Sequence, residues 1–169
     1  MATTQWTDSD RKQVAQDLGR EPRGVVGVAA RGTSGSPLVV VTAPRLPNGT
    51  PFPTTFYLTS PALVNACSTL EAQHFMAELN ARLEEDPDLA AAYARAHQDY
   101  LSRRAEIGRD AGLEPVVEIQ DFSAGGMPSR VKCLHALVGH ALAAGPGVNP
   151  IGDLALEEIQ ARGMWDGKA

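Results

Sequence analysis

The sequence predicts an α+β fold, in which the N-terminal half forms a small antiparallel sheet of three to four strands that packs with about five to six helices. Three runs rich in Val, or in Thr and aromatic residues, lie between positions 24 and 58, and Gly- and Pro-rich segments separate them. Most of the remaining chain repeats apolar residues at helical spacing. Only 5% of the residues are aromatic whereas 43% are hydrophobic, so Ala, Val and Leu must fill the core, which favours closely packed helices. A length of 169 residues fits one domain, residues 1–169.

The N-terminal elements are predicted as one helix followed by three strands. The helix is expected over residues 7–18, because Thr at its start can cap it and Gly19 can end it. Segments 24–30 and 38–42 are Val-rich and form a predicted hairpin, and segment 53–58 follows as a third strand. The simplest topology is therefore a three-stranded antiparallel meander.

The middle of the chain is predicted to be helical. Residues 61–85 form one helix, or two with a break near positions 71–73. A cap followed by a proline at Asp86–Pro87 then starts a long amphipathic helix that Gly108 ends. After it, residues 116–119 are a candidate for a short fourth strand.

Composition and charge exclude several classes of function. The formal net charge is −5 and no long basic run occurs, so general nucleic-acid binding is not expected, and the basic pair Arg103–Arg104 is assigned to a solvated helix face. No run of about 18 apolar residues is present, so no membrane span is expected, and the first ten residues do not resemble a signal peptide. Cys67 and Cys133 form neither a disulfide framework nor a metal knuckle by their spacing. The predicted location is the cytoplasm.

A helix predicted over residues 127–144 carries positive charge at the end where acids are normally favoured. It follows Gly125 and Gly126 and starts with a proline, and Arg130 and Lys132 lie in its first turn. The free N–H groups at a helix start attract anions. A cation at that end interacts unfavourably with the helix dipole unless a bound anion compensates its charge. The pattern predicts a phosphate or carboxylate site; the alternative is that both cations pair with surface acids.

The same helix carries three reactive side chains, Cys133, His135 and His140. Cys133 and His140 are two turns apart, about 10 Å along the axis, so they cannot share a metal ion or act as a pair without another element. No metal site is therefore expected. Each residue is a catalytic candidate on its own, as a base, an anion ligand or a nucleophile, and the alternative is a boundary histidine or a cysteine that fills space. The same alternatives apply to His97.

The loop at residues 145–152 contains three glycines and two prolines. It either presents backbone N–H groups to a ligand or only reverses the chain before a last short helix, which is expected after Asp153. Neither this loop nor the segment GTSGSP ends as a P-loop does, and the sequence contains no GxGxxG, GxSxG or HExxH motif. The sequence therefore indicates no cofactor and does not decide whether the protein is an enzyme.

Four runs resemble an actinobacterial family named domain of unknown function family 501. They are LGREPRGVVGVAAR, APRLPNGTPFPTTFYLTSP, YARAHQDYLSRR and AGGMPSRVKCLHALVGHALAAGPGVNPIGD, and they occur in the family's order over most of the chain. Relatives resemble Arg-Cys-x-x-Gly-x-Pro in the hairpin, where this chain reads RGTSGSP without cysteine. The resemblance implies no activity. It does imply gene neighbours such as enolase, a septum-formation initiator and an exopolyphosphatase-like protein.

Two functions are compatible with these patterns. The first is binding, and possible turnover, of a small anionic or phosphorylated ligand at the start of the 127–144 helix, with His135 and with Arg23, Arg31 and Arg45 from the strand region completing the clamp. The second is a non-catalytic interaction module for a cell-division or central-metabolism partner. In that case the long helix, with Tyr93, Tyr100 and the pair Arg103–Arg104, would offer the binding surface.

Overall fold

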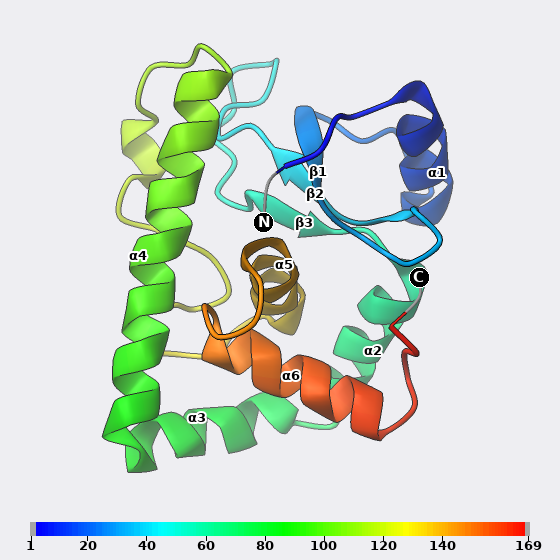
Figure 1. Cartoon of the computed structure of the whole chain (residues 1–169). Helices are drawn as coiled ribbons and strands as arrows, with labels where there is room; N and C mark the ends of the chain where they lie inside the picture. Colours follow the sequence, from blue (N-terminus) through cyan, green and yellow to red (C-terminus); the bar gives the residue numbers. More distant parts are fainter. Residues whose placement is uncertain (1–2, 168–169) are drawn as a thin grey trace.

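The computed structural model describes residues 3–167 and confirms the α+β fold (Figure 1). Within these residues a three-stranded sheet is combined with six α-helices and a short 3-10 helix. None of these helices is both long and apolar enough to cross a membrane. The elements are, in chain order, α1 Asp8–Leu18, β1 Val25–Arg31, β2 Pro37–Thr42, β3 Phe56–Leu58, α2 Pro61–Ala72, α3 Phe75–Glu85, α4 Pro87–Asp110, the 3-10 helix η1 Val117–Ile119, α5 Leu134–Ala144 and α6 Pro150–Ala161.

The sheet is the predicted antiparallel meander, with the strand order β1-β2-β3. Residues that are paired across two strands project to the same face, so the pairs Val25–Thr42 and Val40–Tyr57 share the outer face. The alternate pair Val41–Phe56 projects to the opposite face, where Phe56 packs against α5. The third strand is shorter than predicted. One reason is that the Thr55 N–H donates to Tyr100 Oη (2.7 Å) instead of a strand.

Helix α1 forms as its sequence predicts and packs over the outer face of the sheet. Thr7 and Asp10 make a reciprocal capping box, and Gly19 ends the helix in the left-handed region at φ 68°. Its inward residue Val14 is fully buried. In Figure 1, α1 lies on the opposite side of the sheet from α5.

Helix α5 occupies the centre of the molecule, between the sheet and α6 (Figure 1). Two glycines permit this close packing. A Cβ atom on Gly139 would lie 2.6 Å from the Phe56 carbonyl oxygen, and one on Gly152 would lie 2.3 Å from the Leu137 carbonyl oxygen. The helical backbone therefore contacts β3 on one side and α6 on the other, without a side chain between them.

Three helix predictions are resolved by local geometry. The region 61–85 contains two helices, because His74 adopts a left-handed conformation at φ 63° between α2 and α3. The long helix continues to Asp110, just beyond the predicted end at Gly108. The last helix begins at Pro150, before the predicted position, because the buried Asn149 caps it through a bond from the Gly152 N–H (2.9 Å).

Two predictions between α4 and α5 are wrong. Residues 116–119 contain a 3-10 turn instead of a fourth strand, and the helix expected from Met127 begins only at Leu134. The intervening residues fold back on themselves, since the Lys132 N–H donates to the Gly125 carbonyl oxygen (2.7 Å). The Val131 peptide is held by Asn80 of α3, which both accepts from its N–H (2.9 Å) and donates to its carbonyl (3.1 Å). These tertiary bonds replace the helical bonds that the local pattern predicts.

Candidate functional site

The residues of the predicted anion site lie in a loop rather than at a helix start. Gly125 and Gly126 have φ values of 66° and 97°, which serve the tight reversal. Arg130 and Lys132 are exposed, and within residues 3–167 the Arg130 guanidinium makes no hydrogen bond or ion pair. Its carbonyl oxygen accepts a bond from Tyr93 Oη (2.9 Å). Because this segment is not the start of a helix, no helix dipole acts on Arg130 and Lys132. Both cations are exposed to water, so they do not require a bound anion.

The three arginines of the strand region have different surroundings. Arg31 forms a two-pronged ion pair with Asp10, with nitrogen–oxygen distances of 2.7 and 2.9 Å. Arg45 pairs with Glu118 at 2.9 Å. Arg23 has no hydrogen-bonded or ionic partner among the described residues. The structure does not bring these arginines to Arg130, and only Arg23 is left without a counter-charge.

The ion pair of Arg31 and Asp10 predicts an acid-sensitive contribution to stability. The hydrogen bond from Arg31 holds the pKa of Asp10 well below its usual value of 3.8. A lowered folded-state pKa contributes stability above the unfolded value, and this contribution is lost as pH falls through the acid range. We expect the free energy of unfolding to drop by about 1 kcal/mol between pH 6 and pH 3 from this group. Urea denaturation of wild type and Asp10→Asn checks this, since the variant should lack that part of the decrease.

Several residues that the sequence offers for catalysis or partner binding are buried. His140 is fully buried and both its ring nitrogens are hydrogen-bonded, to Asp99 Oδ2 (2.8 Å) and to the side-chain amide of Asn149 (3.1 Å). His97 is buried against Ser123. Tyr93 and Tyr100 are fully buried, so the predicted partner-binding face of the long helix is wrong. These side chains stabilise the interior.

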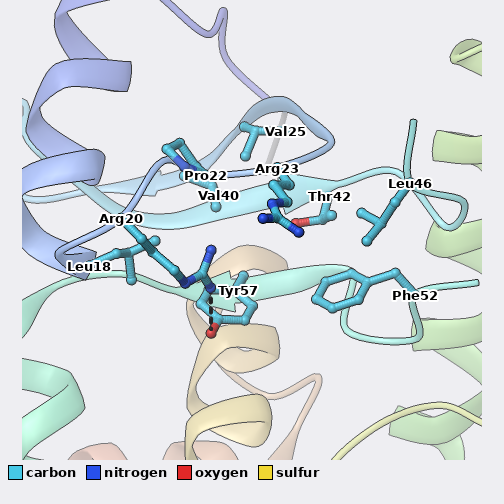
Figure 2. Close-up of a pocket in the computed structure, with 10 residues that line it drawn as sticks. All are labelled: Leu18, Arg20, Pro22, Arg23, Val25, Val40, Thr42, Leu46, Phe52 and Tyr57. Carbon is cyan, nitrogen blue, oxygen red and sulfur yellow. Dashed lines mark hydrogen bonds between the residues drawn. The ribbon is translucent and has the colours of Figure 1, made fainter. Parts of the chain in front are cut away.

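A pocket of about 330 Å³ lies on the outer face of the sheet (Figure 2). The cross-strand pairs Val25–Thr42 and Val40–Tyr57 form its floor. Its volume is within the range of about 300–1,000 Å³ that is typical of small-molecule sites. The end of α1 with the segment that follows it, and the loop between β2 and β3, provide the walls: Leu18, Arg20, Pro22, Arg23, Leu46 and Phe52.

The charged groups that line this sheet-face pocket are both cationic. Arg20 and Arg23 both line it, and Figure 2 shows the guanidinium group of Arg20 beside Tyr57 and that of Arg23 beside Thr42. No acidic residue lines the pocket, and the nearby Glu21 is paired with Arg11 (3.0 Å). Arg20 makes two long hydrogen bonds of 3.4 Å, to Tyr57 Oη and to the Glu21 carbonyl oxygen, and it lies over the Tyr57 ring at 5.9 Å. Positive charge beside an apolar floor suits a ligand with an anionic group and an apolar body.

The aromatic wall of the pocket consists of Tyr57 and Phe52. Their ring planes are inclined by 29°, with centroids 6.3 Å apart. Sequence reasoning missed Arg20, Phe52 and Tyr57 as site residues. The available signal was the pair Arg20 and Arg23 in a four-residue segment between a helix end and a strand.

A second group of reactive side chains gathers where α2 meets the start of α5. His135 Nδ1 lies 3.1 Å from Glu71 Oε1 and 4.0 Å from Cys133 Sγ. The interaction with Cys133, together with the charge of Glu71, raises the pKa of His135 to about 9. Burial opposes ionisation of Cys133, but the hydrogen bond from His135 lowers its pKa. Glu71 belongs to another helix, so spacing within one helix could not reveal this group.

The family assignment rests on a sequence match over residues 28–157, to the family described as "Protein of unknown function (DUF501)". The chain belongs to the DUF501 family. No match was found among the curated proteins or among the solved structures. The part that matches DUF501 includes Glu71, Cys133 and His135, whereas Arg20 and Arg23 precede it.

Proposed function

We propose that this DUF501 protein binds a small ligand with a phosphate or carboxylate group in the sheet-face pocket. The observation that carries the proposal is the pair of cations, Arg20 and Arg23, over an apolar floor without a lining acid. The proposal retains the anionic ligand predicted from sequence and Arg23 from its clamp, and it moves the site away from Arg130. The two free cysteines, Cys67 and Cys133, fit a reducing compartment, so the cytoplasm remains the proposed location.

The ligand class follows from the lining. The two guanidinium groups can donate paired hydrogen bonds to a phosphate or carboxylate. Val25, Val40 and Phe52 present apolar surface on which a flat or aliphatic group can pack. A neutral analogue supplies no negative charge to pair with the two arginines, so it should bind much more weakly.

Thermal unfolding with matched ligand pairs tests this proposal. Nucleosides and their monophosphates, and sugars and their phosphates, differ only in the anionic group. A ligand at about 100 times its dissociation constant stabilises the folded state by about 2.7 kcal/mol, which raises the unfolding temperature measurably. We expect stabilisation by one anionic member and not by its neutral parent, and loss of that shift in the double variant R20A/R23A.

Arg130→Ala is the matched control, since it removes an exposed arginine outside the sheet-face pocket. It should leave the ligand shift unchanged. A shift that survives R20A/R23A but disappears in Arg130→Ala would place the ligand at the loop and refute the pocket proposal.

A second candidate is the interaction module for a cell-division or metabolic partner. One observation favours it: Val117, in η1, and Phe122, three residues after the end of η1, are 64% and 68% exposed. They lie near a mainly apolar cavity of about 210 Å³ that Val116 and Ile119 help to line. If no anionic compound stabilises the protein, this surface becomes the better candidate.

A further inference from the structure

We propose that Glu71, Cys133 and His135 bind a divalent transition metal of the zinc class, with one coordination position left open. Their ligand atoms, a carboxylate oxygen, a thiol sulfur and an imidazole nitrogen, all lie within 4.8 Å of one another. All three residues are half-buried, so a metal ion can reach them from solvent. The three share no residue with the sheet-face pocket, so this inference is independent of the proposed function.

The chemistry of the three ligands fits zinc. Zn²⁺ accepts thiolate, imidazole and carboxylate at about 2.0–2.3 Å, and tetrahedral bond angles then place the ligand atoms about 3.5 Å apart. The observed separations from His135 Nδ1, 3.1 Å to Glu71 and 4.0 Å to Cys133, lie on either side of that value. Small side-chain rotations therefore suffice. A thiolate and a carboxylate also carry two negative charges, which balance the charge of the ion.

The orientation of His135 distinguishes a metal site from a nucleophilic triad. In a triad the histidine contacts the nucleophile through one ring nitrogen and the orienting acid through the other. Here Glu71 and Cys133 both face Nδ1, while Nε2 lies 3.2 Å from Ser68 Oγ. Three ligand atoms that converge on one point are what a metal ion requires.

Groups around the three residues also support metal binding. A histidine that binds a metal through one nitrogen usually donates its other N–H to a nearby acceptor, which fixes the ring. Ser68 Oγ is in position to accept that bond from His135. The Leu134 N–H donates to Glu71 Oε1 (2.7 Å), which holds the carboxylate against the start of α5. With three protein ligands, the fourth tetrahedral position is open to water or substrate, as in catalytic zinc sites.

Cys67 provides a matched control because it is the other cysteine of the chain and does not belong to the proposed site. It is fully buried, and its sulfur does not belong to the three ligand atoms that lie within 4.8 Å of one another. The site should therefore depend on Cys133 and not on Cys67.

Cobalt(II) titration of the metal-free full chain under a reducing agent tests the site. We expect one cobalt ion per chain, a thiolate-to-cobalt charge-transfer band in the near ultraviolet, and loss of both signals on addition of zinc. Cys133→Ser should abolish the band, and His135→Ala and Glu71→Gln should weaken zinc binding at least about 100-fold. Ser68→Ala should weaken it about 10-fold, whereas Cys67→Ala should retain the band.

A substitution that disturbs the fold would also reduce metal binding. Circular dichroism of each metal-free variant therefore checks that the variant is folded. Zinc should raise the unfolding temperature of the wild type and leave that of folded Cys133→Ser unchanged. The proposal is overturned if the wild type gives no charge-transfer band at millimolar cobalt. It is equally overturned if the band persists in Cys133→Ser or is lost in folded Cys67→Ala.

Discussion

Replacing Arg104 with methionine is expected to lower the free energy of unfolding by about 3–5 kcal/mol. The residue is only 4% exposed, although sequence analysis assigns it to a solvated helix face. Its guanidinium group donates to four backbone carbonyl oxygens and to no carboxylate. The acceptors are Pro53 (2.9 Å), Ile119 (2.6 Å), Ser123 (3.5 Å) and Phe122.

The size of this effect follows from the carbonyl groups that would lose their donor. A buried acceptor without a partner costs about 1–3 kcal/mol, and hydrogen bonds from charged donors are stronger than neutral ones. Methionine preserves the length and the apolar stem but supplies no donor. Arg104→Lys should cause an intermediate loss, because one ammonium group cannot reproduce the planar fork.

Arg103→Met is the matched control for Arg104→Met. Arg103 is the preceding residue on α4, half-buried, and its partner Asp99 lies one turn away at 2.6 Å. Such a helical pair contributes about 0.3–0.5 kcal/mol. Urea denaturation of both variants should give clearly unequal losses. In Arg104→Met, hydrogen exchange should also accelerate at the amides of residues 117–124. Equal losses below 1 kcal/mol would contradict the structural role of Arg104.

The elements that the sequence predicts well are those with local signals. The capping box of Thr7 and Asp10 and the end at Gly19 define the eleven-residue helix α1. The hairpin depends on Val-rich runs around a turn, which are equally local. The segment between α4 and α5 depends on distant groups instead. Arg104 and Asn80 form hydrogen bonds with its backbone, and no sequence pattern within residues 111–133 predicts those bonds.

Charges were easier to predict than their partners. The sequence offers Arg23, Arg31 and Arg45 as equal candidates for an anion clamp. Only the structure shows that Arg31 forms an ion pair with Asp10, which precedes it by 21 residues, and that Arg45 forms one with Glu118. Helical spacing likewise relates Cys133 to His140. The start of α5 at Leu134 places Cys133 at the cap position instead, beside His135.

The second large effect is expected at Asn149, a fully buried residue whose side chain serves two elements. Its Oδ1 accepts the Gly152 N–H (2.9 Å) and caps α6, so its amide nitrogen must face His140 Nδ1 (3.1 Å). Nδ1 is therefore an acceptor, and the Nε2–H of His140 donates to Asp99. Asn149→Ala removes the cap and leaves Nδ1 without a donor. The expected loss is about 2–4 kcal/mol.

Asn149→Asp separates these two contributions. Aspartate caps a helix as well as asparagine does, but its carboxylate offers His140 Nδ1 a second acceptor instead of a donor. At pH 8 the variant should lose about 2 kcal/mol. Urea denaturation at pH 8 should therefore show a smaller loss for Asn149→Asp, which keeps the cap, than for Asn149→Ala, which loses both bonds. An Asn149→Asp variant as stable as the wild type would show that the cap alone explains the effect.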